Sequence, residues 1–232
     1  DLHPEKIMSE LLAIELFFGR RRDVIWGPRI LDLDILFIGN QIVSSENLTI
    51  PHPQIAHRRF VLIPMAEIAP VHMILGNHDG LMHNKSRQDA ISPIINAIGS
   101  DRIKLFKQSG VYPTVTPGIN WCVFSCFDED SWDSVVPVPG EINIACFHGS
   151  VRGSSTDSDW KVDGEVTAEF FDGFDYVFLG DIHKRQNVTG DGVIAYPGSF
   201  IQQDYGEDVI KGCLLWDIKT KTSYDSKFIH IV

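Results

Sequence analysis

Apolar residues in the first 70 positions recur first at helical spacing and then at strand spacing. A helix is predicted from Pro4, which suits a first helical turn, to a stop at Gly19. Its apolar positions are Ile7, Leu11, Leu12, Ile14 and Phe18. The segment Leu31–Ile38 predicts a strand, and Gly39-Asn40 predicts a hairpin turn into a second one. This part of the chain therefore indicates a small unit of helix and sheet.

A different pattern follows Pro70, where short apolar runs end in polar loops that contain glycine. Three such runs predict strands, over Val71–Leu75, Ile142–Phe147 and Tyr176–Leu179. We also predict a helix over about 88–98, a strand over 121–127, and strands throughout 194–231. The change of pattern predicts two parts, residues 1–70 and 71–232, in the mixed α/β (α+β) fold class.

The composition is that of an ordinary globular chain. Of the 232 residues, 44% are hydrophobic and 22% are charged. No run approaches the roughly 18 apolar residues that a membrane span needs. The four cysteines form no C-x-x-C pair and no zinc spacing, and three of them lie in apolar runs. We therefore expect buried, reduced thiols and a cytoplasmic location.

The net charge of −11 argues against a protein that holds nucleic acid by charge alone. An acidic chain can gather divalent cations, which then bridge to phosphates. The alternative is that the negative charge only keeps the protein soluble. The composition leaves both interpretations open.

Two carboxylates share one face of the predicted strand over Leu31–Ile38. Side chains alternate along a strand, so Asp32 and Asp34 point the same way while their neighbours face a core. Paired carboxylates can hold magnesium, which fills its other positions with phosphate oxygens and water. Arginines at 20, 22, 29 and 58 are suited to neutralising a polyphosphate. The alternative is an ordinary solvated strand face.

The string WGPRILDLDIL, from Trp26 to Leu36, closely resembles the signature of the hydroxymethyl-dihydropterin pyrophosphokinase family. The resemblance runs from Leu2 to Pro70. It implies a ferredoxin-like α+β fold and a reaction in folate biosynthesis. In that reaction a pyrophosphoryl group moves from ATP to 6-hydroxymethyl-dihydropterin and leaves AMP.

The same resemblance assigns roles to particular side chains. It implies that Asp32 and Asp34 bind two magnesium ions, and that Arg20 and Arg29 act on ATP during transfer. The residues implied to contact the nucleotide or the pterin are Glu15, Trp26, His52, Arg58 and Phe60. The loop between Gly19 and Trp26 is about one residue shorter than the family's usual form.

Residue types that bind metals follow the three predicted strands after Pro70. They are Asn77 and His78, then His148, then Asp181 and His183. Ligands of open sheets collect beyond the carboxyl ends of strands. Imidazole, amide oxygen and carboxylate together suit manganese, iron or zinc. A single histidine is more often structural, so the repetition of the pattern is what predicts a metal site.

These strings resemble a second family, the calcineurin-like metallophosphoesterases. The signature is Gly76-Asn77-His78-Asp79, and Phe178–Gln186 with Tyr196–Phe200 resembles the SbcD-type DNA-repair exonuclease branch. The resemblance covers about 71–232 and implies an αββα sandwich. It also implies manganese-dependent hydrolysis of phosphodiester bonds in DNA, with an SMC-like ATPase as partner.

By this second resemblance, Asn77 and His148 hold one metal and His183 holds the other. His78 is the general acid or steadies the leaving group. Asp181 stands where the family usually has histidine, and a carboxylate can still ligate. The family's bridging carboxylate is expected upstream of Val71, so we predict a single weak metal on Asn77, His148 and Asp181.

The two resemblances meet at about Pro70/Val71, each of them inside its own domain. We therefore expect a chain that joins two partial domains, with the first strand of the pyrophosphokinase family preceding Asp1. Three hypotheses stay open: magnesium-dependent pyrophosphoryl transfer by the first part, manganese-dependent hydrolysis of DNA by the second, and a chimeric or truncated chain that binds metal or nucleotide without turnover.

Overall fold

A computed structural model provides the fold. It describes residues 3–18, 31, 33–36, 38, 43–45, 47–50, 52, 67, 69–200, 202 and 206–230. The helices are α1 Pro4–Phe17, α3 Ser92–Ile98 and the 3-10 turns η2 Glu129–Ser134 and η3 Ala168–Phe171. The first strands are β1 Val43–Ser45, β2 Leu48–Ile50, β3 Val71–Ile74, β4 Ile103–Phe106, β5 Gly110–Pro113 and β6 Ile119–Phe124. The others are β7 Ile142–His148, β8 Tyr176–Gly180, β9 Gln186–Asn187, β10 Ile194–Tyr196, β11 Gly212–Ile218 and β12 Tyr224–His230.

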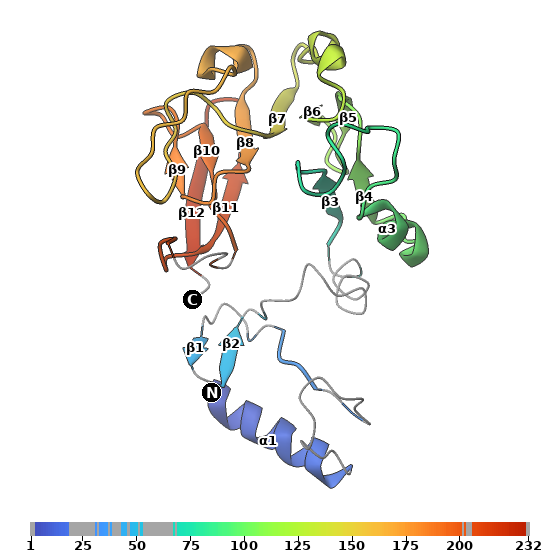
Figure 1. Cartoon of the computed structure of the whole chain (residues 1–232), viewed down its shortest axis with the longest axis vertical. Helices are drawn as coiled ribbons and strands as arrows, with labels where there is room; N and C mark the ends of the chain where they lie inside the picture. Colours follow the sequence, from blue (N-terminus) through green and yellow to red (C-terminus); the bar gives the residue numbers. More distant parts are fainter. Residues whose placement is uncertain are drawn as a thin grey trace.

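Among the described residues of the N-terminal part, α1 and the β1–β2 hairpin form a small unit (Figure 1). The predicted first helix is confirmed, ending at Phe17. Strands β1 and β2 pair antiparallel. The core of this unit, which we call the N-terminal core, joins helix, hairpin and the segment before it: Ile7, Met8, Leu11, Ile35, Ile38, Val43, Leu48 and Ile50. The predicted turn at Gly39-Asn40 lies outside the described residues.

The strand predicted over Leu31–Ile38 is wrong for the residues described there, none of which lies in a strand. The backbone makes other bonds instead. The amide of Leu33 donates to the Glu15 carboxylate at 2.8 Å, and the carbonyl of Leu36 accepts from the His52 amide at 3.1 Å. A side chain of the helix and a loop thus take backbone groups that a neighbouring strand would otherwise use.

A six-stranded sheet organises the rest of the chain, in the order β5-β6-β7-β8-β10-β9. The four central strands run parallel, and an antiparallel strand flanks each side. The predictions for β3, β7 and β8 are confirmed. The parallel arrangement brings the carboxyl ends of β7 and β8 to one edge, because His148 pairs with Gly180 in register.

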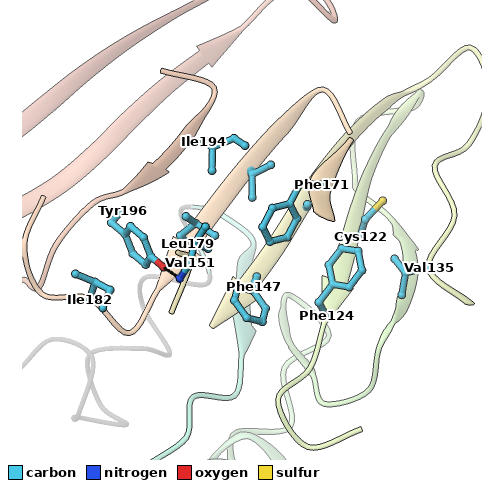
Figure 2. Packing of buried hydrophobic residues seen from close by; sticks show 12 residues of the cluster. Cys122, Phe124, Val135, Phe147, Val151, Phe171, Leu179, Ile182, Ile194 and Tyr196 are labelled. Atoms are coloured by element: carbon cyan, nitrogen blue, oxygen red, sulfur yellow. Dashed lines mark hydrogen bonds between the residues drawn. The ribbon is translucent and has the colours of Figure 1, made fainter. Parts of the chain in front are cut away.

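The two faces of this sheet are covered differently. On one face the rings of Phe124 and Phe147 pack against Phe171 of η3, edge-on for Phe124 and tilted for Phe147, with centroids 5.8 Å apart in each case (Figure 2). On the other face Trp121 of β6 donates to His72 of β3 at 2.7 Å. The β11–β12 hairpin packs on this second face through aromatic contacts of Trp216 and Tyr224. The sheet is therefore buried on both sides.

Three predicted boundaries differ from the structure. The helix expected from about 88 begins at Ser92, because the Asp89 carboxylate binds the Ser92 amide at 2.6 Å and holds the preceding residues in a turn. The strand expected over 121–127 lies at Ile119–Phe124. Within the region 194–231, which the sequence predicts to be strand throughout, the described residues form β10, β11 and β12 and also include non-strand segments such as 206–211.

The mixed α/β class is confirmed, while the ferredoxin-like and αββα folds that the resemblances imply stay predictions. No described helix is both long and apolar enough to cross a membrane.

The predicted burial of thiols is confirmed for two cysteines in the sheet region. Cys122 and Cys126 are buried, and all four cysteines are free. Burial raises the pKa of Cys122 to about 12 and that of Cys126 to about 11. Both thiols therefore stay protonated and unreactive in the folded protein.

Candidate functional site

The N-terminal unit brings two of the predicted ligand residues together. Asp34 and His52 line one cavity of about 280 Å³, and Asp34 Oδ1 lies 3.7 Å from His52 Nε2. The bond from the His52 amide to the Leu36 carbonyl holds the two segments side by side. The cavity also contains Met8, Ile35, Asn47, Leu48 and Thr49. A carboxylate and an imidazole thus face a space suited to a polar ligand.

Glu15 is a buried carboxylate in an otherwise apolar helix face, with 2% of its surface exposed. Its Oε1 accepts from the amide of Leu33, which lies between the two predicted metal carboxylates. Glu15 therefore positions the backbone that carries Asp34. The other predicted residues of this site lie outside the described residues: Arg20, Trp26, Arg29, Asp32, Arg58 and Phe60.

At the edge of the large sheet, three predicted ligands converge. Asn77 Oδ1 lies 3.3 Å from His148 Nε2, and Asn77 Nδ2 donates to Asp181 Oδ1 at 3.2 Å. His148 Nε2 lies 3.8 Å from Asp181 Oδ1. Ligand atoms about 2.0–2.2 Å from one ion lie roughly 3–3.6 Å from each other. The 3.3 Å between Asn77 Oδ1 and His148 Nε2 fits a shared cation, and the 3.8 Å between His148 Nε2 and Asp181 Oδ1 lies just outside this range. We call Asn77, His148 and Asp181 the edge cluster.

Two glycines make room for the His148 ring. A Cβ at Gly76 would lie 2.7 Å from the ring, and one at Gly180 would lie 2.8 Å from its Nδ1. The imidazole therefore passes between the backbone that follows β3 and the last residue of β8. This contact explains physically why a glycine precedes Asn77 and another precedes Asp181.

The residues after these glycines are held in sharp turns. The Asp79 carboxylate accepts from the Gly76 amide at 2.7 Å and closes the first turn. Asp181 has a φ of 94°, which is strained for a residue with a side chain. The Ser150 hydroxyl donates to Asp181 Oδ2 at 3.0 Å and fixes the carboxylate. Such strain is common where a side chain must face a ligand.

Electrostatics keep the His148 ring in the state that binds metals. Burial lowers the pKa of His148, and the carboxylates of Asp181 and Asp79 oppose this shift without reversing it. The ring is therefore neutral near pH 7, as a metal ligand must be. No group of three or more His, Cys, Asp or Glu side chains within the described part of the chain could hold a metal. The edge cluster has three possible metal ligands only because the Asn77 side-chain amide is counted with His148 and Asp181.

The two remaining predicted residues lie next to the edge cluster. His78 is exposed, and its charge and that of His183 act on the pKa of His148. His183 lines a cavity of about 290 Å³ together with Asp181 and Glu207. Its Nδ1 lies 2.5 Å from Glu207 Oε1. The sequence interpretation missed Glu207, which lies 24 residues further along the chain and matches no motif that it used.

Comparison with known proteins identifies the N-terminal part. Residues 1–70 match the 7,8-dihydro-6-hydroxymethylpterin-pyrophosphokinase (HPPK) family. The 2-amino-4-hydroxy-6-hydroxymethyldihydropteridine pyrophosphokinase of Synechocystis sp. is 55% identical over 69 residues, which are 30% of this chain and 35% of that protein. The pyrophosphokinase resemblance of residues 1–70 is therefore confirmed.

Two other relatives match larger shares of the chain. Folic acid synthesis protein fol1 of Pneumocystis carinii is 36% identical over 162 residues, covering 67% of this chain and 22% of that protein. Uncharacterized protein R555 of Acanthamoeba polyphaga mimivirus is 33% identical over 219 residues, covering 84% of this chain and 16% of that protein. The chain thus spans between 16% and 35% of the length of these three relatives. None of the three is described as a metallophosphoesterase, so that resemblance stays a prediction.

Proposed function

We propose that residues 1–70 bind Mg-ATP and transfer its pyrophosphoryl group to a hydroxymethyl-dihydropterin. The observation that carries this proposal is the family match over these residues. The geometry supports it, because Asp34 and His52 line one cavity and Glu15 holds the backbone beside Asp34.

The described donors fit a magnesium site. Asp34 provides a carboxylate with 23% of its side chain exposed, which is the ligand type that magnesium prefers. When bound, magnesium neutralises charge on the phosphates during transfer. In this proposal Asp32 and Asp34 bind two magnesium ions, and Arg20 and Arg29 stabilise the transferring group. Trp26, Arg58 and Phe60 contact nucleotide or pterin. His52 orients the ligands from its place beside Asp34 in the same cavity.

The test is the release of AMP from ATP by the full chain, with and without 6-hydroxymethyl-dihydropterin. We expect AMP only when the pterin and magnesium are both present. Asp34→Ala should remove this activity. Asp101→Ala, a change at an exposed aspartate of the other part, should leave it intact. AMP formation that is independent of the pterin, or equal in Asp34→Ala, would contradict the proposal.

A second activity is proposed for residues 71–232 on the strength of the edge cluster. We propose that Asn77, His148 and Asp181 bind one divalent cation, with Mn²⁺ the expected metal, and that the site hydrolyses phosphodiester bonds in DNA. His183 extends the metal site, and exposed His78 serves the leaving group. An SMC-like ATPase is the proposed partner. The supporting observation is the convergence of three donors from separate strand ends within 3.8 Å.

This second proposal predicts Mn²⁺-stimulated release of nucleotides from DNA. His148→Ala should remove the stimulation, and His83→Ala, at an exposed histidine, is the matched control. Equal release by His148→Ala would rule the activity out. Mn²⁺ binding that depends on His148 but brings no release would favour the third hypothesis, a chain that binds metal without turnover.

A further inference from the structure

We propose that Glu207 is a positioning residue that fixes the ring of His183, so that only Nε2 is available to a cation in the cavity beside Asp181. This inference rests on the metal site proposed for residues 71–232. The sequence did not predict the contact between Glu207 and His183, and the edge cluster does not depend on it.

The contact between the two side chains is direct. Glu207 Oε1 lies 2.5 Å from His183 Nδ1, and 6% of the Glu207 side chain is exposed against 40% of His183. A buried carboxylate beside a half-exposed ring accepts a hydrogen bond from Nδ1–H, which keeps the proton on Nδ1 and leaves the lone pair on Nε2. Carboxylate–histidine pairs of this kind orient metal ligands and raise their basicity.

A buried lysine completes the arrangement. Lys211 has 1% of its side chain exposed, and its Nζ lies 2.9 Å from Glu207 Oε2 and 3.6 Å from Asp157 Oδ2. The same Nζ donates to the backbone carbonyl of His183 at 3.1 Å. Lys211 therefore neutralises the buried carboxylate and anchors the backbone of the histidine that this carboxylate orients.

The backbone of His183 is held from a second direction as well. The amide of Ser199 donates to the His183 carbonyl at 3.2 Å. Gly198 has a φ of 80°, and a Cβ there would lie 2.8 Å from that carbonyl oxygen. The close approach of the chain after β10 is possible only because this residue is glycine. Backbone and ring of His183 are thus both fixed.

The ring of His183 lines the cavity in which the cation is proposed to bind. Its volume is about 290 Å³, and its lining includes Asp181, His183 and Glu207. With Nδ1 occupied, Nε2 is the atom of His183 that can join the Asp181 carboxylate at a cation. The alternative is an ion pair between Glu207 and Lys211 that serves stability alone, which would not control the state of the ring.

The first experiment reads the ring directly in the unmodified full chain. Long-range ¹H–¹⁵N spectra at about pH 8, where a free histidine is neutral, distinguish a ring protonated at Nδ1 from one protonated at Nε2. We expect His183 to be protonated at Nδ1. A ring protonated at Nε2 would overturn the proposal without any variant.

The second experiment measures Mn²⁺ affinity by calorimetry, with urea unfolding in parallel. Glu207→Gln should weaken Mn²⁺ binding by roughly 10- to 100-fold, the usual effect of losing such a partner. Glu207→Gln removes the nearer of the two carboxylates that pair with the buried Lys211. The double variant Glu207→Gln/Lys211→Met therefore removes both charges of this pair to protect the fold. We expect the loss of affinity to persist in it.

The outcomes separate the two proposals. If His183→Ala weakens Mn²⁺ binding but both Glu207 variants bind as the unmodified chain does, the positioning role is wrong and the metal site stands. If His183→Ala and His148→Ala both bind Mn²⁺ normally, the metal site itself fails.

Discussion

Asp89 is the residue where charge and fold are most tightly coupled. Its side chain is 5% exposed and pairs with Lys107 Nζ at 2.7 Å. It also accepts from the Ser92 amide and hydroxyl at the start of α3. Burial alone would raise the pKa of Asp89, but the bonds from Lys107 and Ser92 outweigh it and lower the pKa to about 2.

We predict that Asp89→Asn lowers the free energy of unfolding by about 2 kcal/mol at pH 7, as its lowered pKa implies. The folded pKa lies below the ordinary value of 3.8. The ionised side chain therefore contributes its full stability above about pH 4, and this contribution is lost as the pH falls through about 2. Urea titrations across this range should show the two proteins converge at low pH. Asp101→Asn should differ little from the unmodified chain at any pH, and a constant gap for Asp89→Asn would contradict the prediction.

Residue types alone pointed to the edge cluster, because each donor follows an apolar run and has a glycine beside it in the sequence. Residue types did not indicate the partners that complete the site. Glu207 and Lys211 act on His183 from 24 and 28 residues away, and strands β9 and β10 lie between them in the sequence. Only the tertiary structure brings them together.

At the level of elements, the β11–β12 hairpin is held to the large sheet by aromatic rings. Trp216 lies 5.0 Å from Phe178 and 5.0 Å from Tyr224, measured between ring centroids. The Tyr176 hydroxyl also donates to the Thr220 carbonyl in the hairpin turn at 2.6 Å. The hairpin therefore depends on contacts made by one of its two faces.

Trp216→Ala should destabilise the protein by roughly 2–3 kcal/mol, somewhat less than a fully buried tryptophan, because Trp216 is half-buried. Leu215→Ala is the matched control, since Leu215 points to the opposite face and is 59% exposed. Its effect should stay within about 0.5 kcal/mol. Unfolding in urea measures both, and equal losses would show that the aromatic face does not hold the hairpin.

Elements with a strong local pattern were predictable, and those set by tertiary contacts were not. Strands β7 and β8 are apolar runs buried on both faces, which identifies central strands of a parallel sheet. The segment over Leu31–Ile38 has an equally good strand pattern. There, however, the Glu15 side chain and the His52 amide take two of its backbone groups.

On the scale of the whole molecule, the described chain has separate cores. The N-terminal core contains Leu48 and Ile50, while Val177 and Leu179 belong to the core of the six-stranded sheet. The two clusters share no residue. A third cluster, around Ile103 with Val71 and Met73, shares no residue with either of them. The division at about Pro70/Val71, which the change of sequence pattern indicates, stays a prediction.

Scanning calorimetry should therefore show two transitions. Ile50→Ala removes a side chain that is fully buried in the N-terminal core and should lower one midpoint by several degrees. Val177→Ala, at a residue 1% exposed in the other core, should lower the second midpoint. A single transition moved by both variants would mean that the two parts unfold as one.

The Cys122 thiol can report when the large sheet opens. Its sulfur sits inside the parallel sheet with no exposed surface, and its high pKa leaves almost no thiolate at neutral pH. Cys213 lies half-buried on the β11–β12 hairpin. An alkylating reagent would consequently label Cys213 when the hairpin lifts and Cys122 only when β6 leaves its neighbours. The order in which Cys213 and Cys122 are labelled would show whether the hairpin lifts before the sheet opens, in one unmodified polypeptide.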